Sequence, residues 1–280
     1  MSRDIDSPER DVVAREVEPG PSHDIEPSRD PIPIQERGYM YQISPAELEV
    51  MKDIGRFRTI DIGDLARFKY QGDMDEMGRD LASLKDQGLI ERRTLRLGGE
   101  GRKLSVVVLT KPGKSIVERH SGKAAQQQMY AGFVKPREAL HDAAIYRMYQ
   151  AERSSIEQRG ERIRRVVLDY ELKQRVYRPL AKAKALPKAD YARRQAEVAQ
   201  ANGLKVIDGK IPLPDLRIEY RTPGGEIGHV NLELATEHYR PTQMAGKAAA
   251  GFKFYSADGS AAHLSRVLEE REITAAILSL

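Results

Sequence analysis

Two carboxylates and a lysine in the C-terminal half have the residue types and spacing of a metal-assisted phosphodiester site. Asp215 lies at the start of one predicted strand, and Glu233 lies within the next, after the turn Thr222-Pro223-Gly224-Gly225. Neighbouring antiparallel strands can bring two such carboxylates to one Mg²⁺, which would polarise a phosphate and lower the pKa of an attacking water. Lys247, on a predicted helix after Glu233, would stabilise the developing charge. These residues predict a nuclease-like site in which Asp215 and Glu233 bind the metal and all three are catalytic.

Other residues near this trio have weaker claims. Glu237, one turn after Glu233, and Asp142 or Glu138, on the helix that opens the second unit, could add a ligand or a base. His141 is interpreted as a partly buried histidine with its hydrogen bonds satisfied rather than as a ligand, and the remaining five histidines show no metal-ligand spacing. The alternative for the trio itself is structural, since strand-end carboxylates commonly pair with arginines or satisfy helix N-termini.

The elements that position the trio predict an α/β sheet with helices packed on it. The helix from Pro136 places Leu140, Ala144 and Met148 on one face at helical spacing. Two helices follow the first strand, and the first of them has basic faces. The predicted order is helix from 136, strand 162–169, helices 171–184 and 190–203, strands 214–220 and 228–235, helix 243–255 and strand 273–280.

A winged helix-turn-helix is predicted for residues 39–120. Ser44-Pro45-Ala46-Glu47 has a serine N-cap, a proline at the first helical position and a glutamate three residues after the cap. Helices at 45–55, 62–69 and 74–87 then precede two β-rich segments, ERRTLRL and KLSVVVLT, which flank the loop Gly98-Gly99-Glu100-Gly101. This three-helix order followed by a hairpin is typical of a fold that holds duplex DNA.

The same unit could instead bind protein, because the fold serves both purposes. Its third helix begins with acidic residues that repel phosphates, namely Asp73, Asp75, Glu76 and Asp80. The hairpin carries a cluster of cations typical of a wing that contacts phosphates. The candidate DNA-binding residues are Arg79, Ser83 and Lys85 on the helix and Arg92, Arg93, Arg96, Arg102 and Lys103 on the hairpin.

Composition limits the classes of function. The chain has 280 residues, room for roughly two domains, and its net charge of +4 divides unevenly. Residues 1–40 carry a net charge of −5, whereas residues 135–194 hold sixteen Lys or Arg against eight acids, which suits a polyanion partner. With no cysteine, disulfides, thiolate metal sites and cysteine nucleophiles are excluded. No apolar run could span a membrane and no signal segment is evident, so a cytoplasmic location is expected.

The domain organisation predicted from these features has four parts. A disordered acidic, proline-rich tail covers residues 1–38, and the winged helix-turn-helix covers residues 39–120. A linker covers residues 121–134, and a restriction-endonuclease-like α/β domain with a small mixed sheet covers residues 135–280.

The residues Pro214-Asp215, Glu233 and Lys247 resemble the core of the PD-(D/E)XK nuclease superfamily, except that Ala235 stands where that pattern has its lysine. Residues 45–256 resemble the bacterial replication-relaxation family, proteins of plasmids and other mobile elements that join a winged helix to a nuclease-like domain. The matching residues are Leu81-x-x-Leu84-x-x-x-Gly88-Leu89-Ile90, Leu109-Thr110-x-x-Gly113, His141, Pro214-Asp215, Glu233, Lys247 and Tyr255.

The resemblance implies DNA handling on a mobile element, with duplex DNA as partner and plasmid replication or mobilisation proteins as further partners. The expected function is a DNA-binding protein whose nuclease-like domain lacks full activity. The alternatives are an active Mg²⁺-dependent endonuclease and an assembly factor or transcriptional regulator. Winged helices commonly act as dimers, so a homodimer is a further expectation, although no heptad run indicates one.

Overall fold

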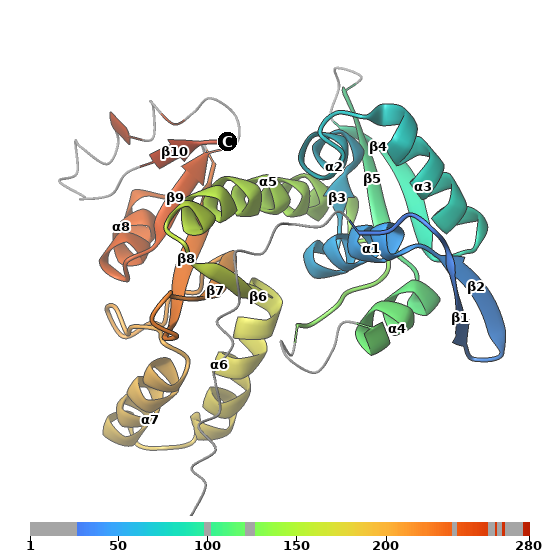
Figure 1. Ribbon diagram of the computed structural model, residues 1–280. Helices are drawn as coiled ribbons and strands as arrows, with labels where there is room; N and C mark the ends of the chain where they lie inside the picture. The colour runs from blue at the N-terminus through green and yellow to red at the C-terminus, as the bar shows by residue number, and fades with distance from the viewer. Residues whose placement is uncertain are drawn as a thin grey trace, which may run out of the picture.

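The computed structural model describes residues 27–97, 102–120, 127–236, 240–256, 261, 265–266 and 277–280. The chain is a mixed α and β protein in which two groups of helices and strands lie on either side of one long helix, α5 (Pro136–Gln158) (Figure 1). None of the described helices combines the length and the apolar character that crossing a membrane requires.

The first group has the predicted order of three helices and a hairpin. The capping box is confirmed, because the Ser44 hydroxyl accepts the Glu47 N–H at 3.1 Å and the Glu47 carboxylate accepts the Ser44 N–H at 2.7 Å. The hairpin β4–β5, called the wing below, joins β3 in a sheet of order β3-β5-β4. The elements are α1 (Pro45–Phe57), β3 (Ile60–Asp61), α2 (Ile62–Lys69), α3 (Met74–Asp86), β4 (Ile90–Leu97), β5 (Arg102–Leu109) and α4 (Lys111–His120).

An additional hairpin corrects the predicted end of the tail. Residues 32–38 were expected to be disordered, but β1 (Ile32–Glu36) pairs antiparallel with β2 (Tyr39–Ile43). Ile34 and Ile43 are buried in the core, and the buried Glu36 accepts a hydrogen bond from the Ser115 hydroxyl at 2.7 Å. A proline can lie in such an edge strand. The predicted tail is therefore folded over residues 32–38, and residues 1–26 lie outside the described part of the chain.

The second group is a five-stranded mixed sheet of order β10-β9-β8-β7-β6, covered by helices. Strands β6, β7 and β8 are antiparallel, whereas β9 runs parallel to both β8 and β10. Its elements after α5 are β6 (Arg162–Leu168), α6 (Asp169–Ala183), α7 (Lys188–Ala201), β7 (Leu216–Arg221), β8 (Ile227–Ala235), α8 (Pro241–Ala249), β9 (Lys253–Ser256) and β10 (Ile277–Ser279).

The helix predicted for residues 243–255 is too long. Helix α8 ends at Ala249, Gly251 adopts a left-handed φ of 87°, and β9 begins at Lys253. The aromatic side chains of Phe252 and Phe254 pack with Met244 of α8 in a small core. A helix through this segment would remove the strand that pairs with β8, so tertiary pairing overrides the helical pattern.

One hydrophobic core extends from the first group through α5 to the sheet. The ring of Phe57 at the end of α1 lies 5.1 Å from Tyr146 and 4.9 Å from Tyr149, both on α5. Because α5 contacts α1, α2 and β3 as well as β6, β7 and β8, it belongs to both groups. The two groups are therefore held by shared packing as well as by the chain that joins them.

The described end of the predicted linker also packs against both groups. The Tyr130 N–H donates to the Gly55 carbonyl at 2.8 Å, and the Gly132 N–H donates to the Leu109 carbonyl at 2.8 Å. The Gln127 amide forms two hydrogen bonds with the backbone of Val166, at 2.9 and 2.8 Å, on the edge strand β6. Residues 127–134 are thus fixed by hydrogen bonds, whereas residues 121–126 lie outside the described chain.

Candidate functional site

Asp215 and Glu233 lie at the same end of the neighbouring strands β7 and β8. Leu216 pairs with Leu232, so one residue further along Asp215 faces Glu233 across the antiparallel pair. Side chains at such opposed positions lie on the same face of a sheet. The Asp215 carboxylate also accepts the N–H of Leu234, with Oδ2 3.0 Å from the nitrogen. The strand pairing therefore places the two predicted carboxylates beside each other.

Lys247 reaches this pair from α8. Its ammonium forms an ion pair with Oε1 of Glu233, whose side chain is only 3% exposed, and the Lys247 side chain is itself mostly buried. Its positive charge is also among the factors that lower the pKa of Asp215. The structure thus brings Asp215, Glu233 and Lys247 to one end of the sheet.

His141 on α5 is a fourth member of this cluster. Its Nε2 lies 3.4 Å from Oδ1 of Asp215, and its Nδ1 lies 3.5 Å from Oδ1 of Asp142. Burial lowers the pKa of His141, but hydrogen bonds to the two carboxylates outweigh it and raise that pKa to about 10. The imidazole is therefore a cation at neutral pH. The sequence interpretation gave His141 satisfied hydrogen bonds, and only the family resemblance named it together with the trio.

The ionisation of Asp215 depends on these cations. Burial raises its pKa, but the hydrogen bond and charge of His141, the charge of Lys247 and the N–H of Leu234 together lower it. Asp215 is consequently an anion at neutral pH that is neutralised by side chains of this chain.

A magnesium ion does not fit this arrangement as it stands. Mg²⁺ requires oxygen ligands in octahedral geometry, but Asp215 already contacts His141 and Glu233 already contacts Lys247. Of the other predicted acids, Asp142 lies 3.4 Å from Arg58, Glu138 lies 3.5 Å from the Tyr170 hydroxyl, and Glu237 lies outside the described residues. Within the described ranges, no three histidine, aspartate or glutamate side chains converge as a metal site.

Asp169, which sequence reasoning missed, lies next to the cluster. It is the first residue of α6, and its N–H donates to the Asp215 carbonyl at 3.2 Å. Leu168 pairs with Leu216, so the acid that ends β6 is brought beside the acid that begins β7. The signal in the sequence is an aspartate directly after the strand RIRRVVL, whose last three residues are apolar. The prediction included this aspartate in the strand without giving it a role.

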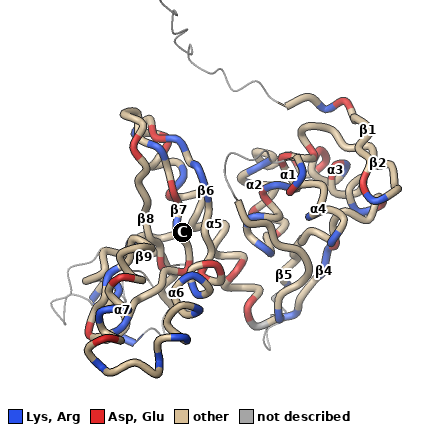
Figure 2. Tube along the Cα trace, turned by 90° about the horizontal axis from the view of Figure 1, so that it is seen from below, with Lys and Arg blue, Asp and Glu red and all other residues tan. Residues whose placement is uncertain are grey.

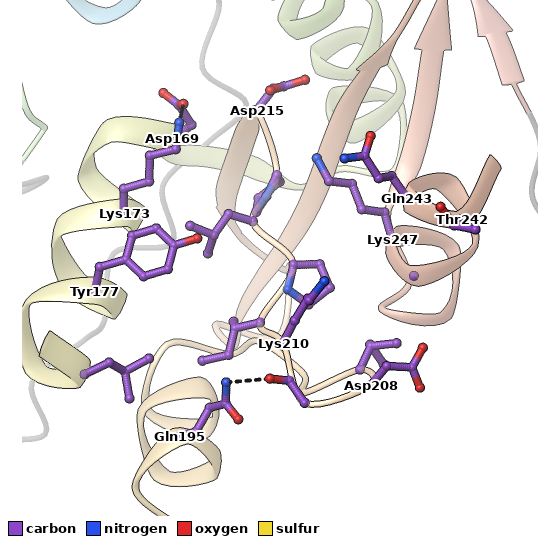
Figure 3. A pocket seen from close by; sticks show the side chains of 18 of the residues that line it. Asp169, Lys173, Tyr177, Gln195, Asp208, Lys210, Asp215, Thr242, Gln243 and Lys247 are labelled. Carbon is purple, nitrogen blue, oxygen red and sulfur yellow. Dashed lines mark hydrogen bonds and ion pairs between the residues drawn. The ribbon is translucent and has the colours of Figure 1, made fainter. Parts of the chain in front are cut away.

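A cavity of about 760 Å³ opens beside the cluster, lined by residues of α6, α7 and α8 and of the segment that leads into β7. Figure 3 shows Asp215 and Lys247 at its upper edge, with Lys173 and Tyr177 projecting from α6 and Gln195 at the opposite end. The segment 207–214, which leads into β7, forms a further wall.

One face of the wing carries exposed cations. Arg96 and Lys103 are paired across β4 and β5, Thr94 pairs with Ser105, and Arg92 lies two residues before Thr94 on the same face. The Thr94 and Ser105 hydroxyls lie 3.1 Å apart. The side chains of Arg92, Arg96 and Lys103 are exposed, and in the described chain none of them forms an ion pair. This face therefore presents cations and hydroxyls to solvent.

The opposite face of the wing packs against the protein. Leu104 and Val106 form a small core with Ala139 of α5, and the Arg93 guanidinium lies 3.9 Å from the ring centroid of Phe133. Arg93 also lies 3.9 Å from Glu91. Arg102 pairs through its backbone with Leu97, and its side chain lies outside the description, as do residues 98–101.

Helix α3 presents mixed charges. Arg79 and Lys85 are exposed, as a groove contact requires, whereas Ser83 accepts a hydrogen bond from the Gln87 amide at 3.3 Å. On the side of Glu76 and Asp80, the segment before β1 covers the helix. Arg29 forms ion pairs with both acids, at 3.0 Å for Asp80, so part of the acidic charge of α3 is neutralised within the chain.

The basic segment 135–194 divides into paired and unpaired cations. Nine of its sixteen Lys and Arg form ion pairs with described acids, most of them on the same helix or a neighbouring strand. The α6–α7 pair keeps a group of exposed cations that have no ion pair with any described acid. These are Arg178, Lys182, Lys184 and Lys188. Arg178 and Lys182 also line a second cavity of about 500 Å³.

Comparisons with known proteins leave the family open. No family profile and no curated protein matches the chain. Among solved structures, Bacillus subtilis PadR in complex with operator DNA is 15% identical over 56% of this chain and 91% of that chain, with a TM-score of 0.23. The restriction endonuclease FokI is 13% identical over 83% of this chain and 65% of that chain, with a TM-score of 0.17. Similarities this low assign neither fold nor function, and the replication-relaxation resemblance stays a prediction.

Proposed function

We propose that this chain is a duplex-DNA-binding protein in which the wing and the α6–α7 pair contact the phosphate backbone, and in which the Asp215 cluster is structural. The carrying observation is the free face of the wing, where Arg92, Arg96 and Lys103 are exposed without an ion pair to any described residue. Because the strand geometry keeps these cations away from acidic side chains, their positive charge is available to an external anion such as a phosphate.

The hydroxyls between these cations support a phosphate contact. Thr94 and Ser105 lie on the same face, and phosphate oxygens accept hydrogen bonds from threonine and serine as well as from arginine and lysine. The acids of α3 weigh against a helix that reads bases, although Arg29 neutralises two of them. Contact of the wing with the DNA backbone therefore accounts for its exposed cations and hydroxyls, whereas base recognition by α3 would have to overcome the acids of that helix.

The second basic surface lies on the α6–α7 pair, apart from the wing (Figure 2). In Figure 1, helices α6 and α7 lie at the bottom of the protein, whereas strands β4 and β5 extend to its top. Because α5 packs against both groups, the two basic surfaces have a fixed relation to each other. The proposed function therefore has two separate phosphate-contacting surfaces on one connected protein.

Salt dependence of DNA affinity tests the proposal. Fluorescence anisotropy with a labelled 30-base-pair duplex, measured between 50 and 200 mM salt, should give a linear fall of log affinity with log salt, with a slope of about −0.9 for each phosphate neutralised. Several contacts should give a slope steeper than about −3. Binding that does not change with salt, or no binding at 50 mM salt, contradicts the proposal.

A metal-dependent nuclease is the second candidate, favoured by the convergence of Asp215, Glu233 and Lys247 beside a cavity. Metal binding there requires that His141 leave its contact with Asp215 and that Lys247 leave its ion pair with Glu233. The test is incubation of supercoiled DNA with Mg²⁺ or Mn²⁺, beside an Asp215→Asn control. Cleavage by the natural chain that the control lacks establishes this activity, and intact DNA in both reactions refutes it.

A further inference from the structure

The cavity beside the Asp215 cluster has the size and the lining side chains of a ligand site. The proposed contacts with the DNA phosphate backbone do not use this cavity. Its volume of about 760 Å³ falls within the roughly 300–1,000 Å³ of small-ligand pockets. Two helices, a loop and a third helix form separate walls, so groups of different chemistry converge on one space.

One side of the cavity offers aromatic and apolar surface. Tyr177 on α6 is 53% exposed, and its hydroxyl forms no hydrogen bond with the described residues. Tyr191 on α7 lines the same space, with Leu180 and Ile211 beneath. An exposed tyrosine ring and a partly buried one beside apolar side chains suit a planar ring, and stacking of a nucleic-acid base on such a side chain is sequence-tolerant.

The floor holds one fixed polar group. Gln195 is buried, and its Nε2 donates to the Gly209 carbonyl at 3.0 Å, as the dashed line in Figure 3 marks. This bond fixes the amide and leaves the side-chain oxygen as an acceptor. An amino group on the edge of a base is the donor that such an oxygen takes.

The cations of the cavity come from three walls: Lys173 on α6, Lys210 on the loop and Lys247 on α8. Lys173 pairs with Asp169 and Lys247 pairs with Glu233, whereas Lys210 is exposed and has no ion pair with a described acid. Of the acids that line the cavity, Asp169 and Asp215 are engaged by Lys173 and His141, and the carboxylate of Asp208 points outward in Figure 3. Lys210 is therefore the cation available to an anionic ligand.

We propose that the cavity binds one nucleotide, with its base against Tyr177 and Tyr191, its base edge at Gln195 and its phosphate at Lys210. The proposal rests on the proposed DNA binding, because the nearest source of a nucleotide is an unpaired position in a bound strand. A free mononucleotide has the same chemistry, and the experiment separates the two sources.

Calorimetry with free ligands tests the chemical class without DNA. The natural chain should bind dAMP or dCMP at least tenfold more tightly than the matching deoxynucleoside or inorganic phosphate. Tyr177→Ala should weaken the nucleotide about tenfold, which corresponds to ~1.4 kcal/mol. Lys210→Gln should remove the difference between nucleotide and nucleoside. Tyr39→Ala, the same change at a 70% exposed tyrosine outside the cavity, should have no effect.

Anisotropy with two duplexes identifies the source. One duplex is fully paired and the other carries a single unpaired nucleotide. A preference for the second that Tyr177→Ala removes, while affinity for the paired duplex is unchanged, supports a nucleotide within a strand. Calorimetric binding without that preference supports a free nucleotide. If the paired duplex binds but neither signal appears, the cavity proposal is overturned, whereas loss of paired-duplex binding contradicts the proposed function instead.

Discussion

Removing the cross-strand cation pair of the wing should reduce the salt dependence of DNA binding by a known amount. Arg96 and Lys103 are directly paired in register, exposed and free of ion pairs with described residues. If each contacts one phosphate, Arg96→Gln with Lys103→Gln should make the slope of log affinity against log salt less steep by about 1.8. Adding Arg92→Gln should raise the change to about 2.7.

The expected change is large enough to measure by fluorescence anisotropy. Between 50 and 200 mM salt, a slope difference of about 1.8 means that the natural chain loses about 12-fold more affinity than the double variant. These side chains are exposed and leave no cavity when shortened, so the melting temperature should stay the same.

A matched control separates phosphate contact from net charge. Lys111→Gln with Lys114→Gln removes the same two charges from α4, which Figure 1 shows well away from the tip of the wing. This control should keep the natural slope. An unchanged slope in the wing variant, or an equal change in the α4 control, refutes the assignment of the wing as the phosphate-contacting surface.

Three further predictions concern the shared core, α3 and the Asp215 cluster. Phe57→Ala should lower the free energy of unfolding by about 3–5 kcal/mol, because a buried ring shared by both groups is removed. Urea unfolding followed by circular dichroism should then show a single transition at a lower midpoint. Two transitions, one of them at the natural midpoint, would show that the two groups have independent cores. Arg29→Ala should cost under about 1 kcal/mol of stability but weaken DNA binding, because two acids of α3 lose their counter-charge; tighter binding would contradict this. The raised pKa of His141 should stabilise the fold fully below pH 6.5, and this stabilisation should be lost as pH rises towards about 10. In urea unfolding, the free energy of unfolding of His141→Gln should therefore fall less between pH 6 and 10 than that of the natural chain. Equal falls would contradict a stabilising role of the His141–Asp215 contact.

Local signals predicted the elements of the first group closely. The helix predicted over residues 45–55 extends two residues further, to Phe57, and its capping box is present because N-cap chemistry depends on neighbours in sequence. The strand pair that carries Asp215 and Glu233 could be predicted for the same reason, since a short turn connects its strands. Lys247 was predicted on the helix that follows Glu233. Its ion pair with Glu233 forms because this helix packs back against the sheet.

The errors arose where distant contacts decide the structure. Leu140 was predicted to share one apolar face with Ala144 and Met148. Leu140 is 44% exposed whereas the other two are buried, because α5 packs against elements on several sides and its buried face is not a single stripe. Strand β9 was assigned to a helix because its parallel pairing with β8 has no local signature. His141 was separated from Asp215 for a similar reason, since α5 and β7 meet only in the folded chain.

The shared helix α5 connects the two surfaces that the proposed function requires. Tyr146 and Tyr149 pack against Phe57 of α1, His141 on the same helix contacts Asp215 at the end of β7, and Ala139 packs beneath the wing. A rotation of one group against the other would have to break the aromatic contacts and the imidazolium–carboxylate contact together. The cation of His141 therefore has a structural use that a metal ion at Asp215 would remove. This argues that the cluster stabilises the relation between the wing and the α6–α7 surface, and that DNA meets these surfaces on a preformed protein rather than on two independent modules.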